Sequence, residues 1–175
     1  LPAGRRTQYR IHLAHYGENL VSVDSLLPNR LIHKSLLQQV LVQFRGYREI
    51  KKEARYGENR FDLYLEDGGR PCFIEVKSVT LVEKDGVARF PDAPSARGSK
   101  HLQELVRTLS DGFRAAVIFV VQREDARVFS PNLVTDPLFT ETLRRAVSAG
   151  VEIYALDCSV SRHGIALRNY LPVEL

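Results

Sequence analysis

The alternation of apolar and polar residues divides the chain into strand-like and helix-like segments. Apolar residues that recur every three or four positions predict helices, whereas alternation with a period of two predicts strands. The expected helices span residues 28–44, 99–111 and 136–149, and the expected strands span residues 7–14, 19–24, 47–56, 60–65, 71–81, 115–121, 151–160 and 165–167. Hairpin strands followed by helical crossovers predict an α/β domain with a mixed central β-sheet flanked by helices.

Two of the expected strands differ in how their faces are exposed. Residues 47–56 place charged side chains on one face, which is typical of an edge strand or of a strand with one wet face. Residues 115–121 are continuously apolar, which is typical of a strand that is covered on both faces and runs parallel to a neighbour.

Residues 66–69 (EDGG) form a hairpin-turn signal, because glycine adopts the positive φ angles that such turns need. The strands on either side of this turn are therefore expected to pair with each other. In the first of them, Phe61, Leu63 and Leu65 should share one face, while Asp62 should lie on the other face.

Length and composition are those of one globular domain, or of one domain with part of another. The 175 residues are 44% hydrophobic and 26% charged, and no apolar run is long enough to predict a membrane span. The chain has no methionine and no signal peptide, which favours a cytoplasmic segment of a longer protein. Cys72 and Cys158 lack the CxxC spacing of zinc sites, so we expect two buried, reduced thiols.

The net charge of +4 weakly favours a polyanionic partner, and the distribution of the cations adds to this. Residues 4–15 carry three arginines and no acid, and these arginines are candidate phosphate contacts: Arg5, Arg6 and Arg10. Residues 45–60 mix six cations with three acids, a pattern that is more typical of a solvated strand face. Arg60 in this segment, and Lys100 and His101 further along the chain, are nevertheless further candidate nucleic-acid contacts.

The segment IEVKSVTL (74–81) carries the candidate chemistry. The strand period places Glu75 and Lys77 on one face and Val76 on the other, and the hairpin would bring Asp62 opposite a position near Glu75. Two carboxylates beside a lysine form a candidate Mg²⁺ site, because Mg²⁺ prefers hard oxygen ligands and keeps several waters. The main-chain carbonyl of Val76 could complete the coordination.

Such an ion would polarise a phosphodiester and lower the pKa of a bound water, while Lys77 would position the nucleophile or neutralise developing charge. The alternative is a cross-strand Glu–Lys pair on a solvated face, which would contribute roughly a fraction of a kcal/mol to stability.

Six segments carry a resemblance to a known family: LPNRLI (27–32), GYREIKKEARYGENRFDLYL (46–65), CFIEVKSVTL (72–81), FPDA (90–93), RGSKHLQEL (97–105) and GVEIYAL (150–156). Through them the sequence resembles the PD-(D/E)XK nuclease superfamily and, more closely, the sugar fermentation stimulation protein A family of bacteria and archaea. The resemblance covers nearly the whole chain from about residue 7 onward.

The resemblance implies a restriction-endonuclease-like domain over residues 27–175. It also implies that residues 1–26 are the last strands of an N-terminal oligonucleotide-binding (OB)-type β-barrel, most of which would precede this segment. Family members are described as DNA-binding and are linked to the regulation of sugar metabolism, particularly that of maltose.

Carried over residue by residue, the resemblance assigns the metal-binding acids to Asp62 and Glu75 and the motif lysine to Lys77. It places three further residues near the site: Asp92, Lys100 and His101. Exposed surface positions are the alternative for Lys100 and His101. Relatives commonly have an acid in the first helix, where this chain has His33-Lys34-Ser35, and they have Glu and Gln where this chain has Ala96 and Ser99.

The sequence therefore predicts a DNA-binding protein with a nuclease-type site for Mg²⁺ or Mn²⁺. The alternative is an active Mg²⁺-dependent DNA endonuclease. The expected partner is DNA, bound with little dependence on its sequence. No membrane partner is expected, and the chain could form a homodimer. A third interpretation, a sugar-binding regulator, is not supported, because the sequence has no cluster of aromatic and amide residues.

Overall fold

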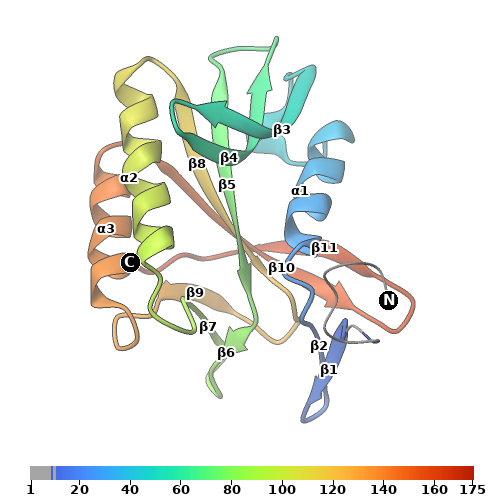
Figure 1. Ribbon diagram of the computed structural model, residues 1–175. Coiled ribbons are helices and arrows are strands. Elements are labelled where there is room, and N and C mark those ends of the chain that lie inside the picture. The colour runs from blue at the N-terminus through green and yellow to red at the C-terminus, as the bar shows by residue number, and fades with distance from the viewer. Residues whose placement is uncertain (1–8, 10) are drawn as a thin grey trace.

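The computed structural model describes Tyr9 and residues 11–175, so the predicted nucleic-acid contacts of Arg5, Arg6 and Arg10 lie outside the described residues. The strands are β1 (Leu13–Tyr16), β2 (Asn19–Ser22), β3 (Glu49–Tyr56), β4 (Asn59–Glu66), β5 (Cys72–Val79), β6 (Leu81–Val82), β7 (Val87–Phe90), β8 (Arg114–Val121), β9 (Val128–Pro131), β10 (Glu152–Val160) and β11 (Ile165–Leu171). The helices are α1 (Leu27–Leu37), α2 (Ala96–Ser110) and α3 (Pro137–Ser148), with a short 3₁₀ helix at Val42–Phe44. The predicted α/β class is confirmed (Figure 1).

A six-stranded mixed sheet in the order β11-β10-β8-β5-β4-β3 forms the centre of the molecule. Strand β8 runs parallel to both β5 and β10, and every residue from 115 to 121 is buried, as the continuous apolar run predicted. Strand β3 is an edge strand, as its charged face predicted.

Helices cover both faces of this sheet (Figure 1). On one face, α2 and α3 contribute Leu102, Leu105, Phe139 and Leu143 to a core that also contains Phe73, Val117 and Phe119. On the other face, α1 contributes Ile32 and Leu36 to a core that also contains Leu63, Ile74 and Ile118. The sheet is therefore the middle layer of three.

Two smaller sheets lie beside the central one: β6-β7-β9, whose strands β7 and β9 the sequence did not predict, and the hairpin β1-β2. Ser22 ties this hairpin to the end of β8, because its N–H donates to the carbonyl of Gln122 at 3.0 Å and its hydroxyl donates to the Gln122 side chain at 2.9 Å. The assignment of the hairpin to an OB-type barrel stays a prediction.

The prediction of one helix over residues 28–44 is wrong, because α1 ends at Leu37. Two residues later, Gln39 adopts a left-handed conformation with a φ of 56°. Its side chain donates to the carbonyl of Tyr47 at 2.9 Å and accepts from the N–H of Gly46 at 2.8 Å. These contacts hold the chain in a turn, where the apolar spacing alone had favoured further helix.

Helix α2 begins three residues before the predicted position 99, at Ala96. The reason is the N-cap residue Ser95, whose hydroxyl oxygen accepts from the N–H of Gly98 at 3.0 Å. A serine in this position satisfies a backbone donor that would otherwise lack a partner at the helix start.

Phe61 does not share a face with Leu63 and Leu65, contrary to the predicted alternation. Leu63 and Leu65 belong to the core beneath α1, whereas Phe61 packs on the opposite face with its ring centroid 5.2 Å from that of Phe73. The side-chain alternation of β4 is therefore broken at the residue between, Asp62.

The interruption continues into β3. Lys52 pairs with Leu63 and Ala54 pairs with Phe61, but Glu53 between them has a φ of 52° and no partner in the described ladder. A non-glycine residue with positive φ is uncommon, and such residues occur often beside functional sites.

Both cysteines are buried in strands, as predicted, and burial raises the pKa of each thiol, at Cys72 and Cys158, to about 12. In the part of the chain that the structure describes, no helix has the length and apolar character needed to cross a membrane.

Candidate metal centre

The candidate site lies where the ladder between β4 and β5 opens. Pairing runs from Leu65 with Cys72 to Leu63 with Ile74, and the described ladder ends there. The next opposed positions are Asp62 and its counterpart on β5, Glu75. The structure thus places two carboxylates at one opening of the sheet, as the hairpin pairing predicted.

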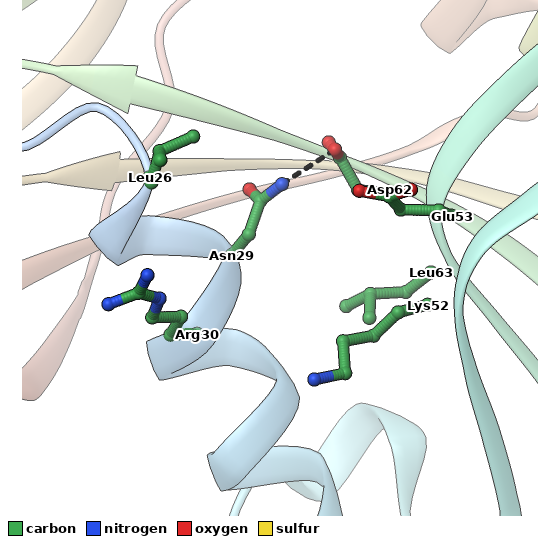
Figure 2. A pocket seen from close by; sticks show the side chains of 7 residues that line it. All are labelled: Leu26, Asn29, Arg30, Lys52, Glu53, Asp62 and Leu63. Carbon is green, nitrogen blue, oxygen red and sulfur yellow. Dashed lines mark hydrogen bonds between the residues drawn. The ribbon is translucent and has the colours of Figure 1, made fainter. Parts of the chain in front are cut away.

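Asp62 is held from two directions. Its Oδ2 accepts a hydrogen bond from the backbone N–H of Val76 at 2.8 Å, and its Oδ1 accepts one from the side-chain amide of Asn29 on α1 at 2.6 Å (Figure 2). Because the N–H and C=O groups of one strand residue point to the same side of the strand, the carbonyl of Val76 also faces this opening.

Glu75 is buried, with 3% of its surface exposed, and its two oxygens have different surroundings. Oε1 accepts from the Lys77 ammonium at 2.7 Å and lies in hydrogen-bond contact with Nδ1 of His101 on α2. His101 Nε2 accepts from Arg97 at 3.3 Å, so Nδ1 carries the proton that is donated to Glu75. Oε2 of Glu75 is buried without a hydrogen-bond partner among the described residues.

The two carboxylates titrate in opposite directions. Burial and the neighbouring charge of Glu75 raise the pKa of Asp62, although hydrogen bonds from Val76 and Asn29 oppose the shift. Burial also works to raise the pKa of Glu75, but the hydrogen bond from His101 and the charge of Lys77 outweigh it, so the pKa of Glu75 is lowered. The ionised form of Asp62 is therefore less favourable here than it is in water.

These donors fit a hard divalent cation. The unpartnered Oε2 of Glu75, a carboxylate oxygen of Asp62 and the carbonyl of Val76 are all oxygen ligands, and a cation between them would relieve the repulsion that raises the pKa of Asp62. Among the described residues, no group of three or more His, Cys, Asp or Glu side chains could hold a metal ion by itself. An ion here would have to complete its shell with the main-chain carbonyl and with water or substrate oxygens, as Mg²⁺ commonly does.

A pocket of about 240 Å³ adjoins Asp62 on the α1 side of the sheet (Figure 2). Its lining comes from the start of α1 and from β3 and β4: Leu26, Asn29, Arg30, Lys52, Glu53, Asp62 and Leu63. Asp62 is therefore accessible to a ligand from the side where α1 begins, whereas Glu75 does not line this pocket.

The other predicted site residues lie at exposed positions. Arg60 on β4 forms an ion pair with Glu53, with its Nη1 3.0 Å from Oε2. Lys100 is exposed on α2, next to the inward-pointing His101, and Asp92 is exposed between β7 and α2. The roles assigned to Arg60, Lys100 and Asp92 stay predictions.

Asn29 is the site residue that sequence reasoning missed. It lies within the segment LPNRLI that carried the resemblance, but Asp62 is 33 positions away, so no spacing rule connects them. The expected acid position of the first helix, Lys34, is exposed and is not among the residues that line the pocket. The contact from α1 to the site therefore comes from the first turn of the helix.

Comparison with known proteins gives concordant matches. Residues 26–164 match the family model described as "Sugar fermentation stimulation protein RE domain". The "Sugar fermentation stimulation protein homolog" of Desulforamulus reducens is 61% identical over 175 residues, which are 100% of this chain and 73% of that protein. The protein of the same description from Caldanaerobacter subterraneus subsp. tengcongensis is 45% identical over 172 residues, which are 98% of this chain and 75% of that protein.

One solved structure is similar over almost the whole chain. It is described as the structure of Pyrococcus furiosus SfsA in complex with Ca²⁺. The match has a TM-score of 0.89 and 34% sequence identity, and it covers 99% of this chain and 75% of the other.

Proposed function

This chain belongs to the sugar fermentation stimulation protein family, and from this premise we propose that it binds DNA and holds a divalent cation between Asp62 and Glu75. The observation that carries the proposal is the buried, unpartnered Oε2 of Glu75 beside a second carboxylate. A buried polar atom without a partner costs about 1–3 kcal/mol, so its presence in a native site favours a missing ligand.

The related Pyrococcus furiosus protein, whose structure is described as a complex with Ca²⁺, supports a hard cation as that ligand. Here the cation would be Mg²⁺ or Mn²⁺, bound by Asp62, Glu75 and the carbonyl of Val76. When bound, such an ion polarises a phosphodiester and lowers the pKa of a coordinated water.

Lys77 and His101 orient the carboxylate of Glu75. Both contact the same oxygen, Oε1, and Oε2 is left without a hydrogen-bond partner among the described residues, free to bind the proposed cation. Lys77, with only 12% of its side chain exposed, also brings a positive charge close to the place where a phosphodiester would lie.

DNA is the proposed partner because it offers phosphate oxygens to the cation and to the basic chain, whose net charge is +4. Contacts of this kind are made to the backbone, so they predict binding with little dependence on base sequence. A link to the regulation of sugar metabolism, and of maltose in particular, rests on the family alone.

The second candidate function is Mg²⁺-dependent cleavage of DNA. Lys77 favours it, because its ammonium lies 2.7 Å from Oε1 of Glu75, whose other oxygen is the proposed metal ligand, and from there it could hold an attacking water or neutralise developing charge. Cleavage requires everything that binding requires, together with a correctly placed water.

The proposal is tested with the wild-type protein and its Glu75→Gln variant, mixed with labelled duplex and single-stranded DNA. Each mixture is measured with chelator, Mg²⁺ or Mn²⁺, and read for binding and for strand scission. We expect both proteins to bind DNA. Cation affinity, measured by calorimetry, should fall by at least about 10–100-fold in the variant, because the loss of supporting groups around metal sites has effects of this size.

Glu141→Gln, the same chemical change on the exposed face of α3, is the matched control and should behave like the wild type. Scission that needs the metal and disappears in Glu75→Gln would establish the endonuclease. Wild-type protein that binds neither cation nor DNA would refute the proposal.

A further inference from the structure

The pocket beside Asp62 is lined by two cations that form no ion pair within the described part of the chain. Lys52 and Arg30 line it, and neither side chain forms a hydrogen bond or an ion pair with another described residue. Figure 2 shows the Lys52 ammonium extending from β3 towards α1, and the Arg30 guanidinium below Leu26, turned away from Lys52. The pKa of His33 on α1 is lowered, first by burial and then by the charge of Lys52, which agrees with this direction.

The two acids of the pocket are already engaged. Glu53 pairs with Arg60, which lies outside the pocket lining, at 3.0 Å. Asp62 accepts hydrogen bonds from Asn29 and Val76 and is one of the proposed cation ligands. The pocket is therefore left with an excess of positive charge that an anion could balance.

The size of the pocket limits what this anion can be. A volume of about 240 Å³ is smaller than the roughly 300–1,000 Å³ of pockets that enclose drug-sized ligands. It suits one phosphate group with part of its sugar, and it is too small for a whole nucleotide. Exposed Arg and Lys side chains are the usual partners of such phosphates.

Resting on the proposed function, we propose that this pocket is a subsite for a DNA phosphate next to the phosphate at the cation. Lys52 and Arg30 bind this neighbouring phosphate and thereby fix the register of the DNA strand over Asp62 and Glu75. Neither side chain reads a base, so the subsite positions the strand without selecting its sequence.

Charge-removing substitutions inside the pocket, matched with similar substitutions outside it, test this assignment. Lys52→Gln and Arg30→Gln remove one charge each inside the pocket. Lys51→Gln and Lys34→Gln remove one charge each outside it: Lys51 is the neighbour of Lys52 on β3 and pairs with Glu66, and Lys34 lies one turn after Arg30 on α1. Duplex DNA affinity is measured for all four variants over a range of salt concentrations, and urea unfolding checks that each variant is folded.

The pocket variants should each bind DNA more weakly and lower the slope of log affinity against log salt by about 1, the change expected for one lost phosphate contact. The control variants should keep the wild-type slope, and Ca²⁺ affinity should be unchanged in all four. Equal losses in pocket and control variants would mean that only total charge matters, and would overturn the subsite.

A titration with inorganic phosphate separates this inference from the proposed function. In chelator, phosphate should shift the NMR signal of the Asn29 side-chain amide in the wild type and not in Lys52→Gln, and Mg²⁺ should strengthen the effect by neutralising Asp62. A phosphate shift without DNA binding would refute the DNA partner and retain the anion site. DNA binding with no phosphate shift and with pocket variants equal to controls would retain the proposed function and refute the subsite.

Discussion

Two charged clusters on the central sheet are built on opposite principles. At the start of β8 and β10, the Arg114 guanidinium donates to the two oxygens of Glu152 at 2.5 and 2.8 Å and to the carbonyl of Gln43 at 2.9 Å. Tyr154 donates to Glu152 at 2.6 Å. In the middle of the sheet, by contrast, Asp62 and Glu75 stand close together and one oxygen of Glu75 has no described partner.

The pKa shifts express the same difference. Burial works to raise the pKa of Glu152, but hydrogen bonds from Arg114 and Tyr154 outweigh it and lower that pKa. At Asp62, burial and a like charge act in the same direction and raise the pKa. A cluster whose partners are complete stabilises the fold, whereas an incomplete one leaves a buried polar atom whose desolvation is not compensated within the described residues.

The largest expected effect that separates the two clusters is on stability. Arg114→Met should lower the free energy of unfolding by about 3 kcal/mol, the low end for breaking a buried pair, because the cluster is only partly covered and Glu152 loses its main partner. Urea unfolding of the wild type and the variant measures this loss.

Arg145→Met is its control, because Arg145 forms an exposed pair with Glu141 and such pairs contribute about 0–1 kcal/mol. Equal losses in the two variants would contradict the structural role of the Arg114 cluster.

A smaller effect of opposite sign is expected at the candidate metal centre. In chelator at neutral pH, Asp62→Asn should be at least as stable as the wild type, because the substitution removes the charge that burial and Glu75 disfavour. Added Ca²⁺ or Mg²⁺ should then stabilise the wild type by about 2.7 kcal/mol at 100 times its dissociation constant and should leave Asp62→Asn almost unchanged. Thermal unfolding with and without cation measures both parts.

A variant that is strongly destabilised in chelator and still responds to cation would reverse the comparison. Asp62 would then be a structural residue, and the cation would be bound elsewhere.

The smallest expected effect is a pH dependence at the complete cluster. The lowered pKa of Glu152 means that its stabilising contribution is fully present above the unfolded-state pKa of about 4.3 and is lost as the pH falls through the folded-state pKa. The stability advantage of the wild type over Glu152→Gln should therefore shrink between pH 6 and about pH 3.5. Urea midpoints across this range test it, with Glu141→Gln on the exposed surface as the control whose difference should stay near zero.

Much of the fold followed from local patterns. The continuous apolar run of residues 115–121 predicted a strand buried on both faces, and the turn signal at residues 66–69 predicted the β4–β5 hairpin. The pattern failed where a single residue overrode it. Gln39 ended α1 through contacts with Gly46 and Tyr47, which apolar spacing cannot reveal.

The candidate site divides in the same way. Period-two alternation was enough to put Glu75 and Lys77 on one face, and hairpin pairing was enough to bring Asp62 near them. Neither could show that Asn29 reaches Asp62 from α1, or that Glu75 meets His101 from the opposite side of the sheet, because these contacts join segments far apart in the chain.

The sequence by itself determined the α/β class, the family and the pair of carboxylates at one level of the sheet. Each of these depends on neighbours in the chain or on one hairpin, so residue type and spacing suffice. The tertiary structure alone decided that the ladder opens at Asp62, that one oxygen of Glu75 is buried without a described partner, and that Lys52 lines a pocket beside it. Those features depend on how α1, α2 and the sheet pack together, because burial and hydrogen-bond partners are set by the elements that close over a residue.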